Sequence, residues 1–175
     1  MLLSITVQFP TKKPTLQFGA CGQIVKEMQK ALNQRLVQLD TVPVSPLSVS
    51  TTGYFDRETR NAVKYLQCLA FLTIDGIVGQ ETWAYLCNGF ASLPILSVGS
   101  SGTVVKAVQE TFKVGGYYFG AIDGIFGAKT EAAVLAFQAE CSLASDGIIE
   151  PFTWNALSKL DSHSSRCSVN AFRGL

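Results

Sequence analysis

The chain has 175 residues, of which 47% are hydrophobic and 15% are charged, and its formal net charge is +1. A chain this apolar and this weakly charged is not intrinsically disordered, and its length allows one ordinary domain or two small ones. The near-neutral charge, with Lys12-Lys13 as the longest basic cluster, argues against nucleic-acid binding. The sequence has no run of about 18 apolar residues, so it predicts no membrane span.

Residues 1–15 form a lead-in to the first predicted helix. The alternation of Leu3, Ile5, Val7 and Phe9 suggests a short strand there. The apolar stretch has no basic residue before it and no small-residue cleavage site after it, so it does not resemble a signal peptide. Three origins stay open: a cytoplasmic protein, a mature form that has lost its leader, or export by another route.

Apolar residues then recur at helical spacing in two series of three segments. The predicted helices span residues 22–33, 57–70 and 80–87, and then 102–113, 128–141 and 151–158. We therefore expect an all-α protein made of two tandem three-helix bundles. Its predicted parts are a first module at residues 16–88, a short linker at 89–95, a second module at 96–158 and a flexible tail at 159–175.

The two predicted modules are copies of one another. Residues 19–29 align with residues 99–109 at an offset of 80, whereas residues 53–86 align with residues 124–157 at an offset of 71. The first copy therefore carries nine extra residues between its first two helices. Two prolines and several β-branched residues in this insertion disfavour a helix, so we expect a loop.

A shorter unit recurs four times. Each copy begins with a turn-forming pair that ends in Gly, continues with two apolar residues and reaches a Thr at the start of a helix. The pairs are Thr52-Gly53, Asp75-Gly76, Asp123-Gly124 and Asp146-Gly147. Asp-Gly favours a tight turn, because Gly tolerates positive φ and Asp bonds the nearby backbone. Asp56, Gly79 and Gly127 then suit an N-cap, and Pro151 suits a first helical position.

Both copies contain the same three motifs in the same order. These are G-x-x-G-x-x-V-x-x-x-Q, then G-x-F-x-x-x-T-x-x-A-V-x-x-[FL]-Q, and then D-G-x-x-x-x-x-T-W-x-x-L. Together they cover about residues 16–158, and they resemble the peptidoglycan-binding domain 1 family. The resemblance implies small three-helix modules that attach proteins to the bacterial cell wall, usually as appendages of wall hydrolases. It implies a location in the cell envelope, with a peptidoglycan glycan or stem peptide as the partner and a wall hydrolase as a further one.

Sugars present apolar ring faces edged by hydroxyls, so a binding surface needs aromatic faces beside amides and carboxylates. The candidate ligand-binding residues are Tyr54, Tyr65, Gln67, Asp75, Gly76 and Tyr85 in the first copy, and Tyr117, Tyr118, Gln138, Asp146 and Gly147, with Phe119 beside them, in the second. Many of these have a structural interpretation as well. The aspartates form turns, Gln67 and Gln138 tie a helix to the neighbouring loop, and Trp83 and Trp154 anchor the core.

Catalysis is not expected, and neither is a metal or a cofactor. The single histidine, His163, lies in the predicted tail, so Ser/His/Asp and Cys/His chemistry and a zinc site all lack a preorganised histidine. Glycoside hydrolysis needs only two carboxylates, but the acids lie mostly on predicted turns and helix surfaces, and the repeat offers no unique pair. The alternative function is a protein–protein interaction module or a regulatory one for a wall hydrolase. Cys167 after Arg166 faintly resembles the cysteine with which metalloprotease pro-segments block their metal, although the flanking proline and glycine are missing.

Cysteines occur at positions 21, 68, 87, 141 and 167. An odd number leaves at least one cysteine unpaired within the chain. Two interpretations stay open: buried free thiols, or one or two disulfides in an oxidising compartment.

Overall fold

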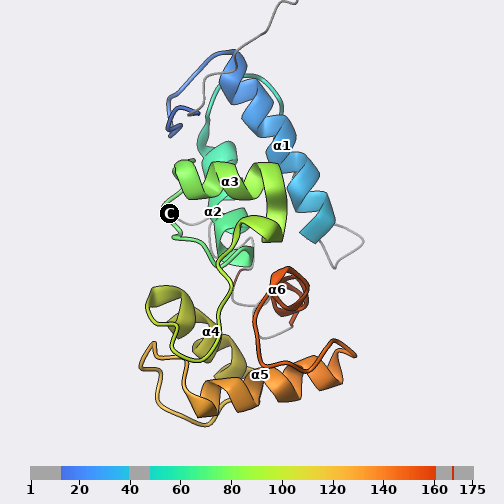
Figure 1. Ribbon diagram of the computed structural model, residues 1–175. Helices are drawn as coiled ribbons and strands as arrows, with labels where there is room; N and C mark the ends of the chain where they lie inside the picture. The colour runs from blue at the N-terminus through green and yellow to red at the C-terminus, as the bar shows by residue number, and fades with distance from the viewer. Residues whose placement is uncertain (1–12, 40–47, 161–166, 168–175) are drawn as a thin grey trace, which may run out of the picture.

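The computed structural model describes residues 13–39, 48–160 and 167. In these residues the chain forms α1 (Gln23–Leu39), α2 (Arg57–Leu69), α3 (Gln80–Asn88), the 3-10 helix η1 (Gly89–Ser92), α4 (Thr103–Val114), α5 (Ala128–Glu140) and α6 (Pro151–Ser158). Helices α1–α3 form one lobe and α4–α6 a second, with η1 at the crossing between them (Figure 1). The predicted all-α fold of two three-helix bundles is confirmed. The predicted strand at Leu3–Phe9 and most of the predicted flexible tail lie outside the described residues.

Each lobe is closed by two isolated backbone bridges at equivalent positions. The pairs are Leu16 with Val78 and Cys21 with Tyr54 in the first lobe, and Leu96 with Ile149 and Ser101 with Ile125 in the second. The partners in the two lobes differ by the same offsets, 80 and 71, that relate the two sequence copies. The bridges tie the segment before the first helix of each lobe to both of its turn units.

The two tryptophans anchor equivalent cores. Trp83 and Trp154 are buried, and each donates its indole N–H to a proline carbonyl, to Pro14 at 2.8 Å and to Pro94 at 2.9 Å. Their interpretation as core residues is confirmed. Because Pro14 and Pro94 are also 80 residues apart, the structural repeat begins before the first glycine of the sequence alignment.

Helix α1 is longer than predicted, because part of the insertion in the first copy is helical. The prediction ended this helix at residue 33, whereas α1 continues to Leu39. Leu36 and Leu39 are buried and extend the apolar stripe of the helix, and no glycine or proline interrupts this segment. Helix α4 ends at Val114, as predicted within one residue, since Gly115-Gly116 follows and Gly116 adopts a φ of 81°.

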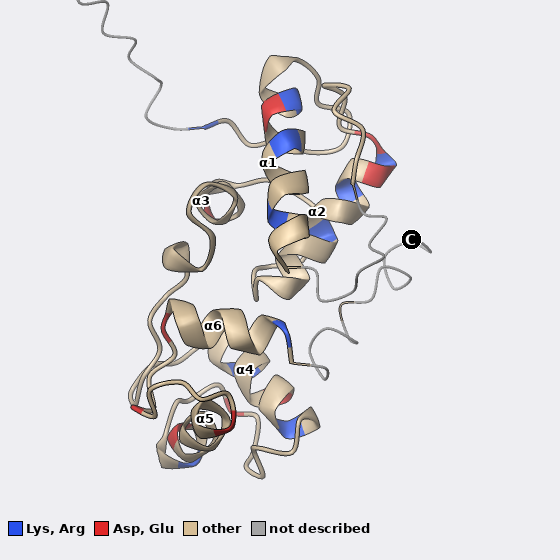
Figure 2. Cartoon of the chain, turned by 90° about the vertical axis from the view of Figure 1, so that its right-hand side faces the viewer, with Lys and Arg blue, Asp and Glu red and all other residues tan. Residues whose placement is uncertain are grey.

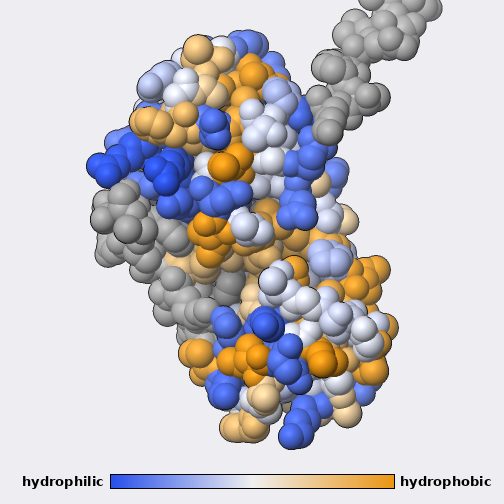
Figure 3. Space-filling view, turned by 90° about the vertical axis from the view of Figure 1, so that its left-hand side faces the viewer, coloured by the Kyte–Doolittle hydropathy of each residue, from blue (hydrophilic) through white to orange (hydrophobic). Residues whose placement is uncertain are grey.

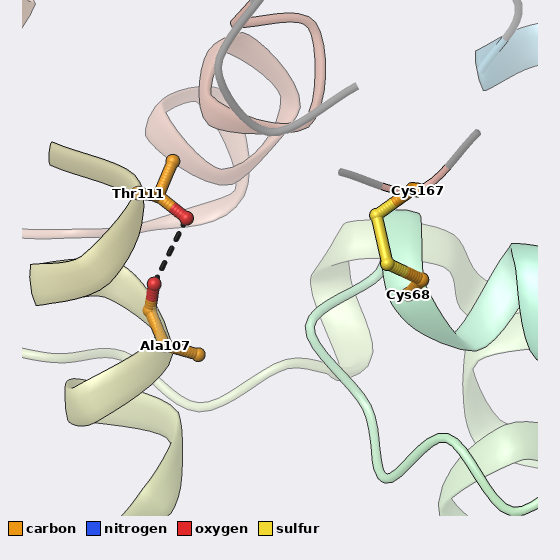
Figure 4. Close-up of a disulfide and its surroundings, with 4 residues drawn as sticks. All are labelled: Cys68, Ala107, Thr111 and Cys167. Atoms are coloured by element: carbon orange, nitrogen blue, oxygen red, sulfur yellow. Dashed lines mark hydrogen bonds between the residues drawn. A yellow bond between two sulfur atoms is a disulfide. The ribbon is translucent and has the colours of Figure 1, made fainter. Parts of the chain in front are cut away.

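Of the two interpretations of the cysteines, the one with a disulfide holds, and the three free thiols are exposed and not buried. Cys68, at the end of α2, forms a disulfide with the buried Cys167. Figure 4 shows this disulfide beside α4, whose Thr111 hydroxyl donates to the Ala107 carbonyl. Cys21, Cys87 and Cys141 are unpaired and exposed. Within the predicted tail, residue 167 is therefore fixed to the first lobe, and its sulfur is not a thiol that could block a metal.

Candidate functional site

A buried glutamine organises the second turn unit of the first lobe. Gln67, on α2, is 1% exposed. Its amide nitrogen donates to Asp75 Oδ1 at 2.9 Å, to the Ile77 carbonyl at 2.9 Å and to Thr82 Oγ1 at 3.2 Å. Its amide oxygen accepts from the Gly76 N–H at 2.9 Å. One side chain therefore joins α2, the turn and the first turn of α3.

Three further glutamines hold their turns in the same way. In each case the amide oxygen accepts from the N–H of the turn glycine at 2.9 Å, in the pairs Gln29 with Gly53, Gln109 with Gly124 and Gln138 with Gly147. Each amide nitrogen also bonds the threonine that starts the next helix, at Thr59, Thr130 and Thr153. The loop-binding interpretation of Gln67 and Gln138 therefore describes their contacts, and these amides are occupied within the fold.

The turn glycines lie where an added side chain would be strained and would crowd a neighbouring side chain. Gly76 and Gly147 both have a φ of 73°, which favours glycine. A Cβ atom on Gly76 would lie 2.9 Å from Arg60 Cγ, and one on Gly147 would lie 3.0 Å from Glu131 Cγ. Both glycines are buried, whereas the adjacent Asp75 and Asp146 are exposed. Of the predicted turn residues, the carboxylates are thus the ones that a ligand can reach.

Hydrogen bonds keep two of these carboxylates ionised. The Ile148 backbone N–H and the Gln138 amide lower the pKa of Asp146. The Gln109 amide and the Ile125 backbone N–H lower the pKa of Asp123 in the same way, with a contribution from Lys106. These turns therefore present negative charge at neutral pH.

The predicted tyrosines are dispersed between core and surface. Tyr54 is 49% exposed, on the turn unit before α2. Tyr65 and Tyr117 are partly buried, and Tyr117 packs edge-to-face on Phe112 and Phe137. Burial and a hydrogen bond to Glu140 raise the pKa of Tyr117 to about 12. The structure does not gather the tyrosines into one cluster.

Tyr85 and Tyr118 lie in the interior of their lobes. Tyr118 is 4% exposed, and its hydroxyl donates to the Ala121 carbonyl at 2.7 Å. The next residue, Phe119, is 89% exposed. Sequence reasoning did not single out two further exposed aromatic rings, Phe18 and Phe152, because the apolar stripes identify buried positions and say little about single exposed rings.

A large cleft lies between the lobes. It has a volume of about 1110 Å³ and is lined mainly by the end of α2, the start of α3, residues 92–94 between the lobes and one face of α4. Apolar surface gathers at this waist of the molecule (Figure 3). Gln80, Glu81 and Thr103 add polar groups to its wall.

The two lobes differ in charge. Residues 16–88 contain six Lys and Arg and six Asp and Glu, whereas residues 96–158 contain three Lys and six Asp and Glu. The Lys and Arg residues of the first lobe lie on α1 and α2 (Figure 2). Lys64 and Arg60 flank its second turn, where the second lobe has Leu135 and Glu131. The two copies therefore present different surfaces around the same turn.

The described part of the chain contains no cluster of three His, Cys, Asp or Glu side chains that could hold a metal ion. None of its helices is long and apolar enough to cross a membrane. The candidate site is thus a pair of repeated turn surfaces together with the cleft between the lobes.

Comparison with known families matches both lobes to one model. The model describes a putative peptidoglycan binding domain and matches residues 21–86 and 101–157. The chain belongs to this family. Its two peptidoglycan-binding modules coincide with the two lobes and with the two copies of the predicted motif set.

Relatives of these modules include wall enzymes many times their size. The chain is 34% identical over 125 residues to the N-acetylmuramoyl-L-alanine amidase CwlM of Mycobacterium tuberculosis, a match that covers 68% of this chain and 31% of the amidase. It is 46% identical over 69 residues to the zinc D-Ala-D-Ala carboxypeptidase of Streptomyces albus G, covering 37% of this chain and 26% of that enzyme. The chain thus spans about a third or less of these two enzymes.

Among solved structures, the N-terminal domain of SleB is 35% identical to the chain. The match covers 38% of this chain and 90% of that domain, with a TM-score of 0.37.

Proposed function

We propose that this protein binds bacterial peptidoglycan and does not cleave it. The observation that carries the proposal is that both lobes belong to the peptidoglycan-binding family and keep the complete motif set. The wall enzymes that it resembles match over only part of their length, so the likeness supports a binding role and not a catalytic one. The proposed site of action is the cell envelope, and a wall hydrolase is the proposed protein partner.

The exposed members of the predicted set are the proposed contacts with the wall. Tyr54 offers a half-exposed ring to a sugar face, and the exposed carboxyl groups of Asp75 and Asp146 accept hydrogen bonds from hydroxyl and amide groups. Gln67 and Gln138 position these turns from beneath. Each module alone is expected to bind weakly, and the tandem raises the apparent affinity where both modules reach one polymer.

The test is co-sedimentation of the full chain with purified insoluble sacculi, with cellulose and chitin as control polymers. We expect the protein to pellet with sacculi and not with cellulose or chitin. The Tyr54→Ala variant should stay partly in the supernatant with sacculi. Val37→Ala, at a 77% exposed position on α1, is the matched control and should pellet like the unmodified chain. Protein that stays in the supernatant with sacculi contradicts the proposal, and release of soluble muropeptides would show catalysis instead.

A further inference from the structure

The cleft between the lobes is mainly apolar and large for a small-ligand site. Its volume of about 1110 Å³ lies above the usual upper limit for such sites, about 1,000 Å³. Both modules contribute apolar side chains to its wall, which are Phe71, Leu72, Ile74, Leu93, Pro94, Val104, Ala107 and Trp154. An open apolar surface of this size is typical of a surface that a polypeptide segment covers.

The disulfide fixes residue 167 at one edge of this cleft. Cys68, to which Cys167 is bonded, lines the cleft, and the Cα atoms of the two cysteines are 5.6 Å apart. Figure 4 shows the disulfide together with Ala107 and Thr111 of α4, which also line the cleft. The segment that follows Cys167 in the sequence therefore starts beside the cleft.

Eight residues, SVNAFRGL, follow Cys167 in the sequence, and their composition suits the cleft. Val169, Phe172 and Leu175 are apolar and recur at every third position. Eight extended residues span up to about 26 Å, so Phe172 and Leu175 can reach well into a hollow that begins beside residue 167. The chain itself thus supplies apolar side chains within reach of an apolar surface.

The charge of the cleft favours the same segment. Of the described residues that line the cleft, Glu81 alone is charged. Arg173 is the single charged side chain in residues 168–175, so the segment brings a cation to a wall that contains a carboxylate and, in its described part, no Lys or Arg. Opposite charges on two surfaces favour their association and disfavour an acidic occupant.

The tether makes weak contacts sufficient. A segment joined to its site by a short flexible connection has an effective concentration in the millimolar range. The disulfide holds residues 168–175 at the cleft in this way, so a few apolar contacts are enough for the segment to occupy it.

We propose that residues 168–175 bind in the cleft between the two modules, with the Phe172 ring against the apolar wall that includes Phe71 and Val104. The segment then contacts both modules, fixes their relative orientation and keeps other molecules out of the cleft. This inference does not depend on peptidoglycan binding, because it concerns a surface apart from the exposed turns.

The first test is photo-cross-linking in the full, oxidised chain. Phe172→benzoylphenylalanine places the reactive group in the segment, and mass spectrometry after proteolysis maps the products. We expect intramolecular cross-links to residues 71–74 or 103–111. Phe18→benzoylphenylalanine, at an exposed position before α1, is the matched control and should reach neither segment. Cross-links from position 172 only to other parts of the chain, or only between two chains, would overturn the proposal.

Amide hydrogen exchange measures the same contact without a probe. Phe172→Ala should accelerate exchange at residues 104–111 about fivefold, because the segment loses one aromatic contact and leaves the cleft more often. Deletion of residues 168–175 should accelerate exchange there at least as much. Phe119→Ala, at an 89% exposed ring that is not among the cleft residues, is the control and should change nothing there. Exchange that is equal in the unmodified chain and in both segment variants contradicts the proposal.

Deletion of residues 1–12 tests the other apolar terminal segment of the sequence. We expect this deletion to leave exchange at residues 104–111 unchanged. If it accelerates exchange there and deletion of residues 168–175 does not, the N-terminal segment occupies the cleft and the proposal is wrong.

Discussion

At the scale of single residues, the buried glutamines hold the turns in place through hydrogen bonds from uncharged side chains. Each has a donor group and an acceptor group inside the fold, and each is bonded on both sides. Removing such a side chain leaves backbone groups of the turn unsatisfied, at a cost of about 1–3 kcal/mol for each buried group. The glutamine is therefore a structural requirement of the turn that presents the exposed aspartate.

Gln138→Leu tests this requirement in the second module. It removes the acceptor of the Gly147 N–H and a donor to the Ile148 carbonyl, so we expect the free energy of unfolding to fall by about 3 kcal/mol. Urea unfolding monitored by tryptophan fluorescence measures the change. Gln34→Leu, at an exposed position on α1, is the control and should change stability by less than about 0.5 kcal/mol. A similar loss in both variants would contradict the role of Gln138.

The turn aspartates make stability depend on pH. Their pKa values are lower in the folded chain than in the unfolded chain, so ionised Asp123 and Asp146 stabilise the fold above the unfolded pKa of about 4. This contribution is lost as the pH falls through the folded pKa values. We expect the melting temperature to be steady from pH 7 to pH 5 and to fall below pH 4. Asp123→Asn combined with Asp146→Asn should flatten this decline, and an unchanged acid profile would contradict the assignment.

Sequence reasoning was effective for the turns and weaker for the aromatic residues. The Asp-Gly pairs predicted their turns, because the conformational preference of glycine is local. Tyr54 and Tyr85 could not be distinguished by sequence, since both occur among apolar residues. Their exposure depends on which neighbours pack over them, and for Tyr85 those neighbours include Phe90 of η1.

At the scale of elements, the extra length of α1 has a specific effect. It places Arg35 beside the last turn of α3, where the guanidinium donates to the Leu86 and Cys87 carbonyls. Carbonyls at a helix end have no partner within the helix, and a cation there also opposes the helix dipole. The second module has Gly115 at the position equivalent to Arg35, so its α6 lacks this contact.

Arg35→Gln should therefore destabilise the end of α3 selectively. We expect a loss of about 2 kcal/mol in the first module, because two hydrogen bonds from a charged donor are removed. Amide hydrogen exchange of Tyr85–Asn88 should accelerate while exchange in α6 stays unchanged. Lys30→Gln, on the exposed face of the same helix, is the charge-matched control. Uniform acceleration in both modules would argue against a local cap.

The elements themselves were largely predictable, and the error at α1 has a physical reason. The prolines at positions 43 and 46 do not restrict the backbone of residues several positions before them. Residues 34–39 contain apolar residues at helical spacing and no breaker, and the burial of Leu36 stabilises the additional turns. The sequence did not predict the 3-10 helix η1, because an element of four residues is too short to show a hydrophobic pattern.

At the scale of the whole molecule, the Cys68–Cys167 disulfide joins α2 to a residue that follows the second module. The sequence separation of the two cysteines is 99 residues. The peptide chain between the two modules is one covalent connection, and the disulfide is a second. Sequence could not identify this pair, because five cysteines permit many pairings and their spacing does not show which two meet in space.

Reduction of this disulfide should lower the stability of the chain considerably. A loop of this length restricts the unfolded chain, and we expect a loss of about 3–5 kcal/mol on reduction. Thermal unfolding with and without dithiothreitol measures it, and Cys167→Ser should abolish the difference. Cys141→Ser, at an exposed unpaired cysteine, should keep it. Equal melting temperatures of the oxidised and reduced protein would contradict a stabilising disulfide.

The disulfide also determines how the molecule responds to mechanical force. A load applied to the chain on either side of the two cysteines passes from residue 68 to residue 167 through the sulfur–sulfur bond. Helices α3–α6, with η1, lie inside the loop that the disulfide closes, so they bear no tension, while α1 and most of α2 lie on the loaded path. Under a pulling force the oxidised protein can therefore extend only the part of its first module that precedes Cys68. The second module bears no force and stays folded until a reductant breaks the disulfide.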